Sequence, residues 1–215
     1  MGRTHPNHSN AVIFEHPLIQ HKLTWMRDAE TGHRPFRALI AQIAGLMVFE
    51  FTRSFPTDIV EVVTPVETTH GQRLSQQITV VPILRAGLGM AEGILEVMPE
   101  ARVGHLGMAR NESTLEPMVY LEKLPSDLDA GPVVLVDPML ATGGSAVEAV
   151  ARLKEIGASD LRLICLVASP EGLRRMQDEH PDVMVYTAAV DRELDERGFI
   201  CPGLGDAGDR MYGTT

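Results

Sequence analysis

The most informative segment of this chain reads Gly131-Pro132-Val133-Val134-Leu135-Val136-Asp137-Pro138-Met139-Leu140-Ala141-Thr142-Gly143-Gly144-Ser145. Its first part, Val133–Val136, is a short apolar run rich in β-branched residues, which predicts a strand buried on both faces. Pro138 cannot donate to a neighbouring strand, so we expect the strand to end beside Asp137. After Ser145 the apolar positions change to helical spacing, at Ala146, Val147, Val150 and Leu153. The stretch therefore predicts a strand, a loop and a helix in that order.

The loop over residues 142–145 has the composition of a phosphate site. Gly143 and Gly144 allow the backbone to turn its N–H groups toward a ligand that approaches closely. The hydroxyls of Thr142 and Ser145 add donors, and the positive end of the following helix favours an anion. The alternative is a glycine-rich turn in which Ser145 only caps the helix. No lysine follows the glycines as in a Walker A loop, and the spacing is not that of a dinucleotide fingerprint.

Strand and helix patterns alternate through the rest of the chain. Strands are expected over 78–84, 103–108, 161–168 and 183–189. Helices are expected over 17–27, from 36 to just before 56, and over 170–180. Two more helices follow the glycine loops, one ending at about 97 and the other at 156. We expect a loose tail over 1–15, a hairpin arm over about 58–79 and little regular structure over 190–215. This order predicts a single α/β domain, 1–215, with a doubly wound parallel sheet whose ligands bind at the carboxyl ends of the strands.

Composition narrows the class of protein. The chain has 215 residues, of which 44% are hydrophobic, a net charge of −10 and a pI near 5.2. This acidity argues against nucleic acid or an anionic membrane as the main partner but leaves a small phosphorylated substrate open. Two cysteines, Cys165 and Cys201, are too few for a disulfide framework and favour a reducing cytoplasm. Residues 1–10 lack an apolar signal core, and no stretch is expected to span a membrane.

Two further segments carry chemistry. The run Val81-Pro82-Ile83-Leu84-Arg85-Ala86-Gly87-Leu88-Gly89-Met90 is a second strand, glycine loop and helix, in which Arg85 is either a diphosphate ligand or a solvated side chain. Residues 198–210 are rich in glycine and contain two acids, Asp206 and Asp209. Such a segment is usually a surface loop, and the alternative is a backbone shaped to contact a flat ligand. The histidines show no metal-ligand spacing.

The loop with its preceding acid resembles the phosphoribosyl-diphosphate loop of the type I phosphoribosyltransferase family. That family usually carries two adjacent acids here, whereas this chain has Asp137 followed by Pro138. The variant Asp-Pro-Met-Leu-Ala-Thr-Gly-Gly-Ser is similar to the uracil-specific members of the family. Three motifs occur in family order and spacing, and the resemblance extends from His16 to Thr214. It implies a hood of N- and C-terminal segments over the sheet, and a salvage reaction in which uracil and 5-phospho-α-D-ribose 1-diphosphate give UMP and diphosphate.

The resemblance also assigns roles. Asp137 would hold the ribose hydroxyls and residues 142–145 the 5-phosphate, while Arg85 and Arg110 would stabilise the leaving diphosphate. Asp206 would lie at the junction of sugar and base, next to backbone groups of Ile200, Gly205 and Ala207 that read uracil. The residues expected to bind phosphoribosyl diphosphate are Arg85, Arg110, Asp137, Pro138, Met139, Leu140, Ala141, Thr142, Gly143, Gly144, Ser145 and Asp206. Two departures are Ala109, where the family has an aromatic, and Cys201, where it has a branched aliphatic.

The same resemblance implies partners. Mg²⁺ would bind mainly through the substrate's diphosphate and ribose oxygens, with no protein side chain assigned as its ligand. A homodimer or homotetramer is expected, and GTP is an effector in some relatives.

Three other functions fit the sequence less well. A regulator that binds nucleotides and RNA would need a basic face, which the charge of −10 disfavours. A phosphoribosyltransferase for a purine would be expected to place an aromatic residue and a lysine near the base, and neither occurs in residues 203–209. A dinucleotide enzyme is disfavoured because no GxGxxG follows a strand.

Overall fold

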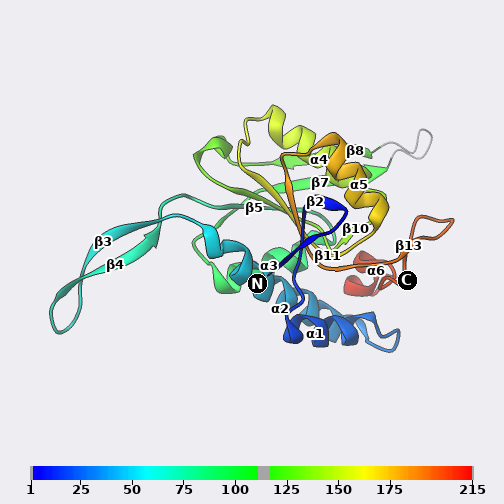
Figure 1. Ribbon diagram of the computed structural model, residues 1–215, viewed down its shortest axis with the longest axis horizontal. Coiled ribbons are helices and arrows are strands. Elements are labelled where there is room, and N and C mark those ends of the chain that lie inside the picture. The colour runs from blue at the N-terminus through cyan, green and yellow to red at the C-terminus, as the bar shows by residue number, and fades with distance from the viewer. Residues whose placement is uncertain (1, 111–116, 215) are drawn as a thin grey trace.

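The computed structural model describes residues 2–110 and 117–214, apart from the side chains of Arg110 and Pro117. A central sheet runs through the molecule (Figure 1), in the order β1 (Arg3–His5), β2 (His8–Ile13), β12 (Met184–Val190), β11 (Leu161–Ala168), β9 (Val133–Val136), β5 (Thr79–Leu84), β7 (His105–Arg110) and β8 (Pro117–Lys123). Neighbours from β2 to β7 are parallel, while β1 and β8 are antiparallel additions at the two edges. Two short strands, β6 (Arg102–Val103) and β10 (Met139–Leu140), pair with β5 and β11.

Strand β9 occupies the middle of this sheet, as its composition predicts. It pairs in parallel with β5 on one side and β11 on the other, and all four of its side chains are fully buried. Just beyond it, the carbonyl of Pro138 accepts hydrogen bonds from Leu166 N and Val167 N. The strand therefore delivers Asp137 to the carboxyl edge of the sheet, where ligands gather in open α/β folds.

Helices cover both faces of the sheet, so the prediction of a doubly wound α/β fold is confirmed. In Figure 1, α4 (Gly144–Glu155) and α5 (Pro170–Glu179) lie above the sheet, and α1 (Pro17–Arg27) and α2 (His33–Phe51) lie below it. Helix α3 (Gly87–Val97) and the C-terminal α6 (Ala207–Tyr212) share the core of α1 and α2. Alternate residues of β9 enter the two cores, Val134 and Val136 on the α2 side and Val133 and Leu135 on the α4 side.

The expected loose tail over residues 1–15 is wrong for Arg3–His5 and His8–Ile13. Strand β2 extends the sheet in parallel with β12, with Ala11 opposite Val185. Asn10 donates from its side chain to Val183 O at 3.1 Å, and Ala11 is fully buried. The apolar run here is only Ala11-Val12-Ile13-Phe14, too short to stand out in the sequence. Its order comes from pairing with β12, which lies far away in the chain.

The expected hairpin arm is present, and Figure 1 shows that it projects away from the body of the molecule. Strands β3 (Thr57–Val63) and β4 (Thr68–Leu74) pair antiparallel, and Thr64 Oγ1 accepts hydrogen bonds from Val66 N and Glu67 N in the turn. The arm ends at Leu74, a few residues before the predicted boundary. It carries exposed apolar side chains, with Ile59 75% and Val66 91% accessible.

The C-terminal residues have more regular structure than expected. Strands β13 (Glu193–Leu194) and β14 (Ile200–Cys201) form a small hairpin, and α6 follows. Ile200, Leu204, Ala207 and Met211 are buried in the core of α2. This order depends on long-range packing that overrides a low local propensity, which is why the sequence pattern did not indicate it.

Helix α2 also departs from an expectation. With the short turn η1 (Thr52–Ser54) it is long and apolar enough to cross a membrane, judged by length and composition alone. In the structure it is a core helix that packs against α1, α3 and α6. The buried residues are Phe36, Leu39, Ile40, Ile43, Ala44, Met47, Val48 and Phe51.

Candidate functional site

The predicted phosphate loop joins β10 to the start of α4 and encloses a hollow of about 140 Å³. Residues 139–146 and Asp137 line this hollow. Gly143 adopts a left-handed conformation, with φ of +77°, that only glycine takes without strain. Its carbonyl accepts a hydrogen bond from Val147 N at 2.9 Å, which closes the first turn of α4. The hollow therefore faces the positive end of a twelve-residue helix.

A buried serine holds the loop in place, and sequence reasoning did not single it out. Ser169 Oγ donates to Ala141 O at 2.6 Å and accepts from Gly172 N at 2.9 Å. Its own N–H donates to Leu140 O at 2.9 Å. The pattern Ser-Pro before a helix marks Ser169 as a cap of α5, but no local signal indicates that it also anchors a loop 28 residues earlier.

A second hollow of about 240 Å³ adjoins the first and shares Asp137, Met139 and Ala141 with it. Its opposite wall comes from the C-terminal segment, through residues 198–200 and 205–208. The structure thus brings Asp137 together with the four predicted base-site residues, Ile200, Gly205, Asp206 and Ala207. Four further residues complete the lining and were not predicted: Ala86, Gly198, Phe199 and Gly208.

Asp137 lies between the two hollows and is partly buried. Burial raises the pKa of its carboxyl to about 7; the hydrogen bond from the Met139 backbone opposes this rise, and the nearby charge of Asp206 adds to it. A carboxyl poised in this way can accept hydrogen bonds from ligand hydroxyls once a cation or donor favours its charged form.

Asp206 has a structural role besides its place in the lining. Its side chain accepts from Asp209 N at 2.9 Å and so caps the N-terminus of α6. The preceding Gly205 is left-handed, with φ of +79°. This turn presents the backbone of residues 205–207 to the second hollow.

Arg85 lines neither hollow, although its neighbour Ala86 does. Its guanidinium lies 5.6 Å from the centre of the Tyr212 ring, and Nη2 lies 3.7 Å from Asp209 Oδ1. The side chain is 57% exposed, so it is accessible to a ligand. Tyr212 also donates from its hydroxyl to Arg85 O at 3.3 Å.

The remaining predicted residues divide into three cases. Pro138 lies buried under the loop and lines neither hollow. Arg110 ends β7, but its side chain lies outside the described part of the structure, as do residues 111–116. Cys201 is half-buried in β14, and Cys165 is fully buried, with burial raising the pKa of its thiol to about 12. Cys165 is thus inert packing, as expected.

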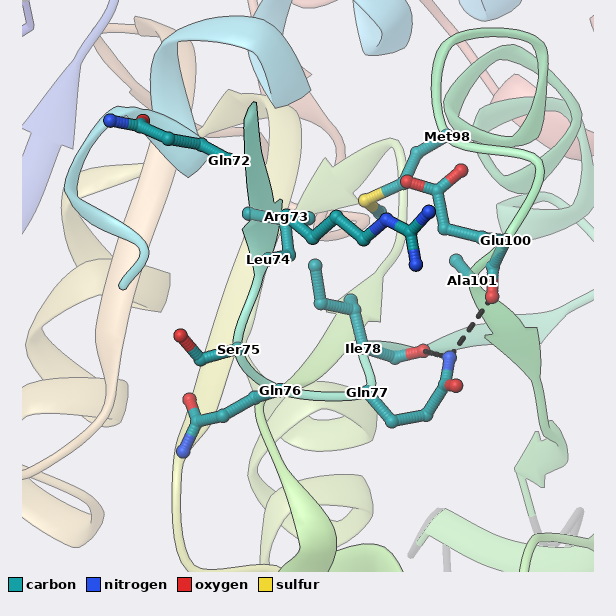
Figure 2. A pocket seen from close by; sticks show the side chains of 10 residues that line it. All are labelled: Gln72, Arg73, Leu74, Ser75, Gln76, Gln77, Ile78, Met98, Glu100 and Ala101. Carbon is teal, nitrogen blue, oxygen red and sulfur yellow. Dashed lines mark hydrogen bonds between the residues drawn. The ribbon is translucent and has the colours of Figure 1, made fainter. Parts of the chain in front are cut away.

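A cavity of about 570 Å³ lies elsewhere, at the base of the arm (Figure 2). Figure 2 shows Arg73 extending from β4 toward the turn that carries Met98 and Glu100. Gln77 bridges this turn by donating to Ile78 O at 3.3 Å and Glu100 O at 3.0 Å. None of the predicted site residues lines this cavity.

Comparison with known proteins places this geometry in a family. Residues 12–214 match the family model described as "Uracil phosphoribosyltransferase". A protein of that name from Bacillus pumilus is 56% identical over 207 residues, covering 96% of this chain and 99% of its own, and one from Shouchella clausii is 52% identical over the full length of both. A solved protein from Aquifex aeolicus is 37% identical with a TM-score of 0.90, covering 95% of this chain and 99% of that one.

A more distant structure shares the fold alone. The adenine phosphoribosyltransferase of Trypanosoma brucei, solved with AMP, pyrophosphate and ribose-5-phosphate, has a TM-score of 0.58 at 12% identity. It covers 92% of this chain and 88% of its own.

Proposed function

The chain belongs to the uracil phosphoribosyltransferase family and is a phosphoribosyltransferase, and we propose that its two adjoining hollows convert uracil and 5-phospho-α-D-ribose 1-diphosphate to UMP and diphosphate. The observation that supports this assignment is the position of Asp137. It is shared by a hollow that begins a helix and a hollow walled by backbone of the C-terminal segment. A nucleotide has its phosphate, sugar and base in that order, and the two hollows and the carboxyl between them match it.

The phosphate end is proposed to bind at residues 142–145. Backbone N–H groups at the start of α4, together with the hydroxyls of Thr142 and Ser145, would surround the 5-phosphate. Asp137 would then accept hydrogen bonds from the ribose hydroxyls. This ligand contact favours the charged carboxylate, so binding would lower the pKa that burial raises.

The leaving diphosphate is proposed to bind Arg85 and Arg110. As the bond from the anomeric carbon to the diphosphate breaks, negative charge grows on the diphosphate and positive charge on the sugar. Guanidinium groups grip such anions bidentately and stabilise them most in the transition state. The exposed position of the Arg85 side chain supports this role.

Uracil is proposed to be read by backbone groups of Ile200, Gly205 and Ala207, with Asp206 at the junction with the sugar. One edge of uracil presents an acceptor, a donor and an acceptor, which peptide N–H and C=O groups can match. Cytosine presents a donor in place of O4 and would leave a buried amide unpaired, at a cost of about 1–3 kcal/mol. The left-handed Gly205 supports this reading because it turns the backbone toward the hollow.

Mg²⁺ is proposed as the cofactor, and the donor set at the site suits it. Asp137 offers a carboxylate oxygen whose charged form is disfavoured by burial and by Asp206, and a divalent cation nearby would favour it. Among the described residues, no group of three or more His, Cys, Asp or Glu is arranged around a metal position. Substrate oxygens would therefore supply most ligands, and the ion would neutralise the charge of the diphosphate.

A substrate panel tests the assignment. Purified protein is incubated with phosphoribosyl diphosphate, Mg²⁺ and each of uracil, cytosine, hypoxanthine and adenine, and nucleotide and diphosphate are measured. We expect turnover with uracil only. Turnover with a purine, or none with any base, would contradict the proposal.

Assembly, regulation and location are further proposals. A groove of about 390 Å³ between α1, α2 and α3, lined by Leu18, Leu46, Phe49 and Val97, and the apolar arm support a homodimer or homotetramer. Light scattering coupled to gel filtration measures the number of subunits.

GTP is proposed as an effector from the resemblance alone, and adding GTP to the assay tests this proposal. Two free cysteines support a cytoplasmic location, and the charge of −10 supports the absence of nucleic-acid or membrane partners.

A further inference from the structure

An ion pair outside both hollows holds the segment that forms the wall of the second one. Arg27, the last residue of α1, donates to both carboxylate oxygens of Asp191 at 2.7 Å each. Asp191 follows β12, and its side chain is only 6% exposed. A buried carboxylate must be paired, so this bidentate contact fixes the positions of both side chains.

Both partners of this pair also bind backbone groups of one residue in the C-terminal segment, Gly203. Arg27 Nη1 donates to Gly203 O at 2.6 Å, and Gly203 N donates to Asp191 Oδ2 at 2.8 Å. The N–H and the C=O of Gly203 are therefore both held by the ion pair. Gly203 lies three residues after Ile200 and two before Gly205, and both of these line the second hollow.

A second arginine binds the backbone of the next residue, Leu204. Arg210 Nη1 donates to Leu204 O and to Met26 O, each at 2.8 Å. Its Nη2 reaches Asp28 O and Thr31 O, beyond the end of α1, and its guanidinium lies 4.3 Å from the centre of the Phe36 ring. Residues 203 and 204 are thus tied to the C-terminal end of α1 by two guanidinium groups.

We propose that Arg27, Asp191 and Arg210 are positioning residues that set the base selectivity of the enzyme, because they fix the backbone on which uracil is read. None of the three lines either hollow. Their effect is carried by Gly203 and Leu204 to the flanking residues, where a small displacement changes which edge groups a base can pair. This inference rests on the proposed base site at Ile200, Gly205 and Ala207.

The structure offers a matched control for the ion pair. Arg162 donates to both oxygens of Asp160 at 3.0 and 3.1 Å, and its guanidinium lies 4.6 Å from the Phe55 ring centre. This pair lies at the amino end of β11, whereas Asp137 follows the carboxyl end of the neighbouring strand β9. Arg162→Lys therefore removes a similar bidentate contact without touching the C-terminal segment.

The experiment compares Arg27→Lys, Asp191→Asn, Arg210→Lys and Arg162→Lys with the unaltered protein. Lysine keeps the charge at position 27 but cannot hold two carboxylate oxygens and a carbonyl in one plane. We expect the first three changes to raise the KM for uracil by about 10- to 100-fold, with the KM for phosphoribosyl diphosphate within about two-fold. The ratio of kcat/KM for uracil over cytosine should fall by a similar factor. Arg162→Lys should leave both KM values and this ratio unchanged.

Other outcomes overturn the inference. We call Arg27, Asp191 and Arg210 together the clamp. A lower Tm with an unchanged KM for uracil and an unchanged ratio of kcat/KM for uracil over cytosine would mean that the clamp only stabilises the fold. Equal rises in both KM values would mean the same. The unaltered protein and Gly205→Val separate this failure from that of the proposed function. If the unaltered protein does not use uracil, or Gly205→Val keeps full activity, the base site itself is misplaced. If both behave as expected, only the role of the clamp is lost.

Discussion

The Nη2 atom of Arg85 lies 3.7 Å from Asp209 Oδ1, so the loop between β5 and α3 meets the C-terminal helix α6 at this contact. Asp209 is itself fixed, because its N–H donates to Asp206 and its carboxylate accepts from Thr214 Oγ1 at 2.6 Å. Exposed ion pairs at such distances contribute about 0–1 kcal/mol. A diphosphate carrying several charges can therefore displace Asp209 from Arg85 at little cost.

Arg85→Ala should lower kcat by about 10²–10³-fold and raise the KM for uracil by less. The reason is that the charge on the leaving diphosphate grows in the transition state. Arg85→Lys should restore only part of this loss because the bidentate geometry is gone. Asp209→Asn is the matched control and should change kcat by less than about five-fold. Steady-state kinetics with both substrates varied measure these effects. A change confined to the KM for uracil would rule out this role for Arg85.

Gly143→Val should raise the KM for phosphoribosyl diphosphate by about 100-fold or more while the protein still folds. Valine is strained at φ of +77°, and its Cβ would lie 3.3 Å from Gly172 O, so the phosphate loop must shift. Gly157→Val is the control at the other end of α4, with φ of +110° and open space around it. It should cost stability without changing either KM. Equal kinetics in the two variants would refute the assignment of the loop.

Gly205→Val should abolish turnover of uracil, whereas Ile200→Val should keep uracil strongly preferred over cytosine. The first change strains a left-handed residue, with φ of +79°, on the wall of the base hollow. The second only trims a side chain that is buried in the core of α2. The measurement is kcat/KM for both bases in both variants. An active Gly205→Val, or an Ile200→Val that accepts cytosine, would show that a side chain elsewhere selects the base.

The activity should fall as the pH falls below about 7, because the carboxylate of Asp137 must be charged to hold the ribose hydroxyls. The pH profile of kcat/KM for phosphoribosyl diphosphate reports the free enzyme, in which the pKa of Asp137 is about 7. Asp137→Asn should give low activity without this step. A profile that is flat from pH 6 to 8 would contradict the proposed role.

The raised pKa of the Asp137 carboxyl also makes the stability of the fold depend on pH. Its pKa is higher in the folded chain, about 7, than the ordinary 3.8, so its contribution to stability is full below about pH 4 and is lost as the pH rises through 7. Asp137→Asn should therefore raise Tm at pH 8 and raise it much less at pH 4. The free energy of unfolding at pH 8 should increase by at most about 4 kcal/mol, at 1.36 kcal/mol per pKa unit. Thermal unfolding of Asp137→Asn and the unaltered protein at the two pH values measures this difference. An equal gain in Tm at both pH values would contradict the prediction.

Local signals in the sequence determined the central elements of this protein. The run Val133–Val136, the proline after Asp137 and the two glycines before α4 lie next to one another, so propensity and hydrophobic pattern agree there. The same agreement fixed α1, α2 and the hairpin arm. Residue types alone indicated a phosphate loop, because a strand, a glycine loop and a helix present donors at one place.

Long-range contacts, which no local pattern indicates, set the place of strand β2 beside β12, the anchoring role of Ser169 and the contacts of Arg27 and Asp191 with Gly203. Arg27 and Asp191 are 164 positions apart, and Arg27 and Gly203 are 176 apart. A buried charge must find a partner, but nothing local to an arginine at the end of a helix says which carboxylate or carbonyl will reach it. That partner is set by the order of the strands in the sheet and by the path of the C-terminal segment across α1, because these bring distant residues together.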